Sequence, residues 1–475
     1  MKKFYITTSI AYTNASPHIG FALELIQADS LARYNRSLGR NVWFLTGTDE
    51  HGLKIAQKAK EMGKEPQEFC DEIVSEFKSL TKELNISNND FIRTTDRERH
   101  WPGVTKLWKA IKDSGDIYEK EYEGLYCVGC EAFVKDKDLI DGKCPYHHKA
   151  PELVREKNYF FRLSRYSNQI MKALEDGVLE IIPSTRKNEV LSFARKGLED
   201  ISFSRPKEKV EWGIPVPGDE NQSIYVWGDA LTNYISAIGY GRDEEIFNNH
   251  WPADIHFIGK DISKFHALIW PGMLLSAGLP LPKKLFIHGF LTINGQKMSK
   301  SLGNVVDPRE LIRQYGADPV RYFFLREVTP TEDGDFSPEK FKERYNADLA
   351  SGLGNLAART ITLAARTGVS APRRIDPTII AEIEKTKSGC SAMMDEFKFN
   401  LALEEIWRLI AFADRYVEAN RPWEKKAKRE EIIGNLLFML ESIAQLVEPF
   451  MPNSSALILA QIKEGKSEPI FRRSD

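Results

Sequence analysis

The feature that most restricts the fold is an alternation of strand-like and helix-like segments that begins at the N-terminus. Segments 4–9 and 41–47 are short and rich in β-branched and aromatic residues, as buried parallel strands are. Helical patterns follow them at 19–38 and 53–62. This order predicts a doubly wound, parallel, Rossmann-like α/β domain.

The alternation stops near Gly115, and short segments with Cys, Gly and Pro continue to about Pro217. Strand-like segments resume at 223–227, 254–259 and 285–290, with a helical pattern from 262 to 277. The simplest interpretation is one α/β domain, in halves 1–114 and 218–337, interrupted by an insertion at 115–217.

From Pro338 onward strand signals are absent, and amphipathic helical patterns such as Leu401–Val417 and Ile432–Val447 dominate. We therefore expect residues 338–475 to form an all-α helical bundle.

Composition excludes several classes of protein. With 66 Lys and Arg against 68 Asp and Glu, the chain is not a globally basic nucleic-acid coat protein, although a local basic patch stays possible. A hydrophobic content of 42% excludes a disordered chain. No apolar run reaches the roughly 20 residues that span a bilayer, and the N-terminus suits a first strand better than a signal peptide. We expect a cytoplasmic protein without a membrane partner.

The cysteines cluster in the expected insertion. Cys127-Val-Gly-Cys130 is followed by Cys144-Pro-Tyr-His147, and two pairs with a two-residue spacer are typical of a tetrahedral Zn²⁺ site. His148 is the competing fourth ligand. Four protein ligands leave no open position, so the zinc is expected to be structural. Chance proximity of reduced thiols is the alternative, and this spacing does not suggest a disulfide framework.

Two loops of the α/β part carry residues suited to nucleotide chemistry. Pro17-His18-Ile19-Gly20 follows the first strand and opens a helix, where α/β sheets bind nucleotides. Lys297-Met298-Ser299-Lys300-Ser301 places two ammonium groups and two hydroxyls on a Gly-flanked loop that could close over phosphates. A capping histidine and a solvated basic turn are the alternative interpretations.

Taken together, these two loops resemble the signature motifs of class I aminoacyl-tRNA synthetases, in the family's order. Further segments make the chain similar to the methionyl-tRNA synthetase family, and the resemblance covers essentially the whole chain: Ser9-Ile10-Ala11-Tyr12, residues 47–52, 226–234 and 257–266, and, in the helical part, 354–359 and 420–423.

The resemblance implies an enzyme that joins methionine to ATP, forming methionyl-adenylate and pyrophosphate, and then passes methionine to the terminal adenosine of its tRNA. By similarity, Asp49 anchors the substrate ammonium, aided by the backbone near Ser9 and Ile10. The side-chain pocket is implied to be formed by Tyr12, Trp227, Ala230, Tyr234, Ile262 and His266. We expect the Tyr12 hydroxyl and the His266 ring N–H to donate weakly to the sulfur.

The same resemblance assigns ATP to both loops. His18, Lys297 and Lys300 are the implied catalytic residues, and Mg²⁺ is expected to accompany ATP through phosphate oxygens. The full implied ATP-binding set is His18, Gly20, Gly259, Lys260, Asp261, Lys297, Ser299 and Lys300. The family's first motif usually ends in a second histidine, where this chain has Phe21, so the rate of adenylate formation stays open.

In the helical part the resemblance implies anticodon binding. Trp423 is placed to stack on an unpaired base, and Asn355 and Arg359 lie four residues apart, so they share a helix face from which they could contact base edges. The family's additional C-terminal tRNA-binding module is absent from this sequence, which favours a monomer.

Two alternatives stay open. One is another class I synthetase, for cysteine, leucine or isoleucine, against which Trp227, Tyr234 and His266 argue. The other is a non-catalytic tRNA-binding paralogue, which Phe21 suggests, whereas Asp49 and the lysine loop do not. The sequence leaves the editing of homocysteine undecided.

Overall fold

The computed structural model describes residues 2–146, 148–298, 304–370, 374–424 and 428–474. Residue contacts divide the chain into two compact units. The first unit comprises Met1–Ser16, Gly39–Ser79 and Asn88–Ile287, and the second comprises Pro17–Leu38, Leu80–Ser87 and His288–Asp475.

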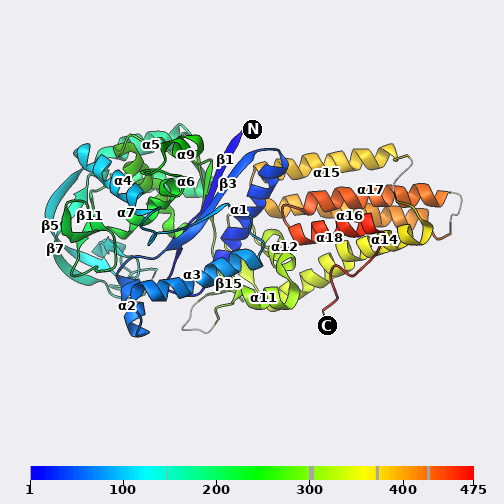
Figure 1. Cartoon of the computed structure of the whole chain (residues 1–475), viewed down its shortest axis with the longest axis horizontal. Coiled ribbons are helices and arrows are strands. Elements are labelled where there is room, and N and C mark those ends of the chain that lie inside the picture. The colour runs from blue at the N-terminus through cyan, green and yellow to red at the C-terminus, as the bar shows by residue number, and fades with distance from the viewer. Residues whose placement is uncertain (1, 147, 299–303, 371–373, 425–427, 475) are drawn as a thin grey trace. The chain divides into compact units, whose positions relative to one another are not determined.

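A seven-stranded sheet forms the centre of the first unit (Figure 1). Its strand order is β2-β3-β1-β13-β14-β8, with β4 paired to β3. Strand β1 pairs in parallel with β3 and β13, β2 and β4 pair in parallel with β3, and β8 pairs in parallel with β14. The strands are β1 (Lys3–Thr8), β2 (Ala11–Tyr12), β3 (Asn41–Asp49), β4 (Asp90–Arg93), β8 (Glu180–Ile182), β13 (Ile255–Gly259) and β14 (Lys284–His288).

Every residue of β13 is buried, as is expected for a central strand covered on both faces. The predicted parallel α/β fold is therefore confirmed, with strand ends within two residues of the predicted ones for β1, β3, β13 and β14. The unit's helices are α2 (Leu53–Glu61), α3 (Pro66–Glu83, which continues into the second unit), α4 (Trp101–Asp113), α5 (Ser167–Glu175), α6 (Ser184–Ala194), α7 (Val226–Leu231), α8 (Asn233–Ser236), α9 (Glu244–His250) and α10 (Trp270–Ser276), with short 3₁₀ or π segments at Asp136–Asp138, Leu163–Tyr166, Lys260–Ile262 and Phe265–Ile269.

The expected insertion, together with the strand that directly follows it, forms antiparallel sheets. One has the order β6-β5-β7-β9, with β5 (Ile117–Cys127), β6 (Ala132–Val134), β7 (Glu152–Phe161) and β9 (Ile201–Ser202). The other has the order β10-β12-β11, with β10 (Ser204–Pro206), β11 (Pro215–Val216) and β12 (Asp219–Ile224).

Two details differ from the sequence interpretation. Strand β8 lies within segment 115–217 but joins the central parallel sheet, because three residues are too few to give a recognisable pattern. The predicted strand at 223–227 is wrong: β12 ends at Ile224, and a helix begins at Val226. The short run of apolar residues there spans the end of the strand and the first turn of the helix, a boundary that periodicity alone does not locate.

The second unit is mainly helical. Within its described residues after Pro338, all regular structure is helical, which confirms the predicted all-α part. Figure 1 shows the long helices α14 to α18 in yellow to red, with α16 and α17 packed together. A small sheet of order β16-β15-β17 precedes them. The elements are α1 (Ile19–Ser37), β15 (Leu291–Ile293), β16 (Gln296–Lys297), α11 (Pro308–Tyr315), α12 (Ala317–Glu327), β17 (Gly334–Phe336), α13 (Pro338–Arg344), a π segment (Tyr345–Gly354), α14 (Asn355–Thr367), α15 (Pro377–Asp395), α16 (Phe399–Asn420), α17 (Arg429–Val447) and α18 (Pro452–Glu464).

A buried ion pair explains why α1 belongs to this unit. Arg321 of α12 is fully buried (0% exposed), and its Nη1 lies 2.7 Å from Oδ2 of Asp29 in α1. Its remaining N–H groups donate to backbone carbonyls of residues 84, 449 and 450. A buried charge persists only when it is paired and fully hydrogen-bonded, so these contacts fix α1 against the helices that follow.

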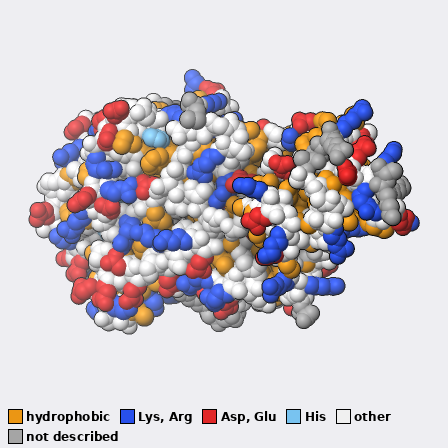
Figure 2. Space-filling view, turned by 45° about the vertical axis from the view of Figure 1, so that its right-hand side comes forward, with side chains coloured by type: hydrophobic (Ala, Val, Ile, Leu, Met, Phe, Trp, Pro, Cys, Tyr) orange, Lys and Arg blue, Asp and Glu red, His pale blue; other side chains and the backbone are white. Residues whose placement is uncertain are grey.

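Charged side chains of both signs are interspersed over the face seen in Figure 2, in keeping with a formal net charge of −2. Among the described residues, no helix has the length and apolar character that a membrane span requires.

Candidate active site

Asp49 ends strand β3, where it pairs in register with Tyr12 of β2. Its carboxylate accepts the backbone N–H of His51, while Oδ1 is buried and has no hydrogen-bond partner among the residues that the structure describes. Burial raises the pKa of Asp49 well above its usual range, and the carboxylates Asp229 and Glu131 raise it further. A buried carboxylate in such surroundings is suited to a cationic ligand.

The turn after Asp49 is fixed by Glu50, whose side chain is fully buried (0% exposed). Arg93 holds it with two hydrogen bonds, of 2.8 Å from Nε and 2.6 Å from Nη2. The hydroxyls of Thr48 and Thr95 donate to its two oxygens at 2.6 and 2.7 Å. This paired and fully hydrogen-bonded carboxylate makes the turn rigid, which fixes the direction of Asp49.

Next to this turn lies a buried histidine–aspartate–histidine group that the sequence analysis did not identify. His51 Nδ1 and His100 Nε2 each lie 2.7 Å from a different oxygen of Asp229, which is 1% exposed. Although burial acts to raise it, the pKa of Asp229 is lowered, because both histidines interact with the carboxylate. The group fixes helix α7, which also carries Trp227 and Ala230.

Aromatic rings form the next part of the site. Trp227 stacks on Phe265 with centroids 3.8 Å apart, and Tyr234 Oη lies 2.7 Å from His266 Nε2. His266 Nδ1 lies 3.0 Å from the carbonyl oxygen of Ile262, which can only accept a hydrogen bond. The ring proton therefore sits on Nδ1, and Nε2 accepts from Tyr234. Burial lowers the pKa of His266 to about 4, so the ring is neutral at pH 7.

The two groups predicted as weak donors to a thioether sulfur are engaged with other residues in this structure. The Tyr12 hydroxyl donates to Glu131 Oε1 at 2.7 Å, and the His266 ring N–H is occupied by the Ile262 carbonyl. Either acceptor would lose a hydrogen bond if its donor turned to a ligand. What these residues offer a ligand side chain is aromatic and apolar surface.

The other residues predicted for this site lie in the same unit. Ser9 and Ile10 connect β1 to β2, and the Ser9 N–H donates to the Phe257 carbonyl at 2.8 Å. Ile10 and Ile262 are partly buried against the hydrophobic core that includes Tyr234, as is Trp227. Gly259, Lys260 and Asp261 follow at the carboxyl end of β13.

The first signature loop lies in the second unit, where His18 is the N-cap of α1. Its Nδ1 accepts the Gly20 N–H at 3.0 Å, so the proton of the neutral ring sits on Nε2. A Cβ at Gly20 would lie 2.9 Å from the His18 ring and 3.6 Å from Met298 Cε. The position thus has little room for a side chain. The Ile19 and Gly20 N–H groups already have acceptors, so the positive end of the helix, rather than these donors, favours a phosphate here.

The second signature loop adjoins the first within this unit. Met298 lies against Gly20, and the Ile19 N–H donates to the Val306 carbonyl at 3.3 Å. The backbone of Lys297 lies at the end of β16. The predicted residues Ser299 and Lys300 lie outside the described residues. The two loops that the sequence separates by most of the α/β part are therefore neighbours.

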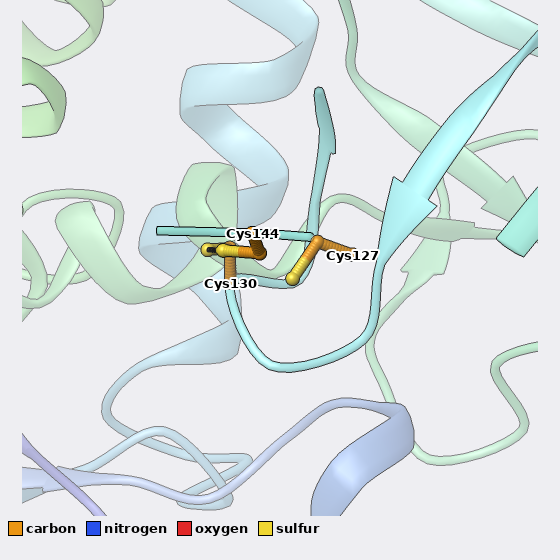
Figure 3. A group of neighbouring side chains, drawn as sticks. All are labelled: Cys127, Cys130 and Cys144. Atoms are coloured by element: carbon orange, nitrogen blue, oxygen red, sulfur yellow. Dashed lines mark hydrogen bonds between the residues drawn. The ribbon is translucent and has the colours of Figure 1, made fainter. Parts of the chain in front are cut away.

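Figure 3 shows the side chains of Cys127, Cys130 and Cys144 turned toward one another. Their sulfur atoms all lie within 4.8 Å of one another, with 3.6 Å between those of Cys130 and Cys144. Sulfurs around a tetrahedral Zn²⁺ stand roughly 3.8 Å apart, given Zn–S bonds of about 2.3 Å, so the three cysteines fit a zinc ion. Burial and the neighbouring sulfurs raise the pKa of Cys130, a cost that a bound cation removes.

The fourth zinc ligand was predicted to be His147, with His148 as the alternative. The predicted ligand His147 lies outside the described residues. Among the described residues, the group of possible metal ligands around these sulfur atoms does not include the competing residue His148. The His148 backbone N–H donates to the Cys144 carbonyl at 2.8 Å.

Two of the residues predicted to bind an anticodon, Arg359 and Trp423, are in contact in the helical part. The Arg359 guanidinium lies over the Trp423 ring, 4.9 Å from its centroid, and Nη1 is held 2.8 Å from Glu418 Oε1. Trp423 is 43% exposed, and Asn355 lies exposed at the first position of α14, one turn before Arg359. Arg429 donates to the carbonyls of the Pro422–Trp423 turn at 2.8 and 3.2 Å, which holds the exposed ring in place.

Comparison with known proteins gives two family matches. The family described as tRNA synthetases class I (M) matches residues 4–152 and 137–361, and the anticodon-binding domain of tRNA ligase matches residues 376–473.

Similar individual proteins agree with these matches. A methionine–tRNA ligase of Thermotoga maritima is 45% identical over 97% of this chain and 75% of its own, and that of Brucella suis is 43% identical over 96% and 91%. The structure of Mycobacterium tuberculosis methionyl-tRNA synthetase in complex with methionyl-adenylate superposes with a TM-score of 0.92 at 40% identity, covering 97% of this chain and 93% of the other.

Proposed function

Since this chain belongs to the methionine–tRNA ligases, a family of class I aminoacyl-tRNA synthetases, we propose which of its residues hold methionine, ATP and tRNA. The enzyme joins methionine to ATP, giving methionyl-adenylate and pyrophosphate, and then transfers methionine to the 3′-terminal adenosine of its tRNA.

The observation that carries this assignment is Oδ1 of Asp49, which is buried without a hydrogen-bond partner among the described residues and lies on the strand residue paired with Tyr12. The α-ammonium of methionine supplies the missing cation. Tyr12, Trp227, Ala230, Tyr234, Ile262 and His266 supply apolar and aromatic contacts to the thioether. Sulfur–aromatic contacts contribute about 0.3–1.5 kcal/mol each, which favours methionine over aliphatic side chains of similar size.

The ATP phosphates are assigned to the signature loops. The Nε2–H of His18 donates to phosphate oxygens, and the positive end of α1 favours their negative charge. Lys297, Ser299 and Lys300 stabilise the charge that develops on the phosphates, while Gly259, Lys260 and Asp261 contact the nucleotide. The methionine carboxylate is the nucleophile, so no residue forms a covalent intermediate, and Mg²⁺ accompanies ATP through phosphate oxygens.

The helical part is assigned to the anticodon. Trp423 offers one exposed ring face to an unpaired base, since Arg359 lies over the ring. Asn355 and Arg359 then contact base edges or phosphates of the loop.

Zinc is assigned to Cys127, Cys130, Cys144 and His147, as a structural ion. Purified protein should contain zinc in an amount equimolar to the chain, measured by plasma mass spectrometry. Cys130→Ser should lose most of it and unfold at a lower temperature, since structural zinc contributes to folding. The control Cys390→Ser changes a buried thiol of α15 and should keep the ion. Full zinc content in Cys130→Ser would contradict the assignment.

Reduced thiols and the use of tRNA both favour a location of the protein in the cytoplasm.

The proposed function is tested by ATP–pyrophosphate exchange across a panel of amino acids. We expect exchange with methionine, and at least about 100-fold lower kcat/KM with leucine, isoleucine and cysteine, because each lacks the thioether or its length. Equal exchange with another amino acid would assign the chain to a sister synthetase. Absence of exchange with every member of the panel would favour a non-catalytic paralogue.

A further inference from the structure

Glu131 is a buried carboxylate to which the reaction gives no role. It is 4% exposed and directly follows Cys130 in the chain. Its backbone has φ 49°, the left-handed region that non-glycine residues seldom adopt. Strained positions of this kind persist where surrounding contacts hold them, which directs attention to what the side chain binds.

The carboxylate of Glu131 caps helix α2. The N-cap residue of this helix is Gly52, which has no side chain to accept the first N–H groups. Glu131 Oε1 accepts the Lys54 N–H at 3.0 Å instead, at the positive end of the helix. A Cβ at Gly52 would stand only 2.3 Å from Glu131 Oε2, so glycine leaves the space that the carboxylate occupies.

The same oxygen also holds Tyr12. Tyr12 Oη donates to Glu131 Oε1 at 2.7 Å. Tyr12 is the register partner of Asp49 on the neighbouring strand, and Gly52 lies three residues after Asp49 on the turn. Glu131 thus contacts two neighbours of Asp49: Tyr12, its partner on the adjacent strand, and the start of α2, where the turn after Asp49 ends.

We propose that Glu131 is a positioning residue for methionine, which orients the Tyr12 ring and the turn that carries Asp49. The inference deepens the proposed function and rests on it, because it takes Asp49 and Tyr12 as methionine contacts. Without the carboxylate, the buried Tyr12 hydroxyl and the Lys54 N–H lose their acceptor and must move to find another. The ring and the turn then no longer present one fixed surface to the substrate.

The test compares Glu131→Ala with Glu131→Gln. The amide oxygen of glutamine can accept both hydrogen bonds, so this variant should restore what alanine removes. The control Glu121→Ala removes an exposed carboxylate from β5, the strand that precedes the turn carrying Glu131. Thermal unfolding of each variant shows whether it is folded before its kinetics are interpreted.

For Glu131→Ala we expect the methionine KM in pyrophosphate exchange to rise about tenfold, with the ATP KM changed less than about twofold. Glu131→Gln should stay within about threefold of wild type for both substrates. In a Tyr12→Phe background, Glu131→Ala should raise the methionine KM by a smaller factor than in wild type, because the shared hydrogen bond is already gone.

Three results would overturn the inference: an unchanged methionine KM in Glu131→Ala, equal rises for methionine and ATP, or a Gln variant as impaired as Ala. If Glu131→Ala does not fold, Tyr12→Phe alone tests the inference, because it removes the shared hydrogen bond and keeps the carboxylate that caps α2. The methionine KM should then rise while the ATP KM stays within about twofold, and an unchanged methionine KM in Tyr12→Phe would overturn the inference. Wild-type protein without methionine-dependent exchange is a different failure, which removes the proposed function itself.

Discussion

Asp49→Asn should weaken methionine binding more than any other single substitution in the first unit. Asparagine keeps the shape of the side chain but leaves the substrate ammonium without its counter-charge in a buried position. Losing one partner of a buried charge pair costs about 3 kcal/mol, a factor of about 100 in the methionine KM. The ATP KM should stay within about twofold, because Asp49 is assigned no contact with the nucleotide.

Isothermal titration with methionine, together with exchange kinetics at varied methionine and ATP, measures this effect. Asp113→Asn is the matched control, since it changes an exposed carboxylate at the end of α4 in the same unit. An Asp49→Asn protein that folds and binds methionine like wild type would show that the ammonium is held elsewhere.

The pH profile adds a second signature to the same substitution. The pKa of Asp49 in the free protein is raised by burial and by Asp229 and Glu131. Below that pKa the carboxyl is neutral and cannot pair with the ammonium, so methionine affinity should fall as pH falls through it. Wild type should therefore show an acidic limb in kcat/KM for methionine, and Asp49→Asn should lack it.

The second large effect is expected in the second step of the reaction, the transfer of methionine to tRNA. Trp423→Ala should lower kcat/KM for tRNA in aminoacylation by about 10- to 100-fold, since stacking of one base on an aromatic ring contributes about 1–3 kcal/mol. Methionine-dependent pyrophosphate exchange needs no tRNA and should remain within about twofold of wild type.

Two controls separate stacking from general damage to the helical part. Trp423→Phe keeps an aromatic face and should recover part of the loss. Leu457→Ala removes another exposed apolar side chain, 41% exposed on α18, and should leave charging unchanged. Equal losses in charging and exchange for Trp423→Ala would argue against a role at the anticodon.

Much of the fold could be predicted because the decisive signals are local. Strands β1, β3 and β13 are short segments rich in β-branched and aromatic residues, and α1 and α16 have helical patterns, so their bounds follow from the sequence to within a few residues. Strand β8 has three residues and its partner β14 lies about a hundred residues later, so its place in the sheet depends on tertiary contacts. The grouping of α1 with the helical unit depends on the buried pair of Asp29 and Arg321, which no local pattern reveals.

The site divides in the same way. Motif spacing predicted that Cys127, Cys130 and Cys144 converge, and the structure confirms it. Glu131 could not be recognised, because a glutamate after a metal knuckle is usually a solvated side chain, and only the folded chain shows its contact with Tyr12. The ring nitrogen of His266 that carries the proton could not be predicted, because it is set by the Ile262 carbonyl one turn earlier.

The direct trapping of methionyl-adenylate tests the central claim that this site activates methionine. The purified chain is incubated with methionine, ATP labelled in the α-phosphate and inorganic pyrophosphatase, and the protein-bound product is isolated. We predict methionyl-adenylate in an amount equimolar to the chain, and none with leucine or isoleucine. No bound adenylate with methionine, or an adenylate of another amino acid, would contradict the account.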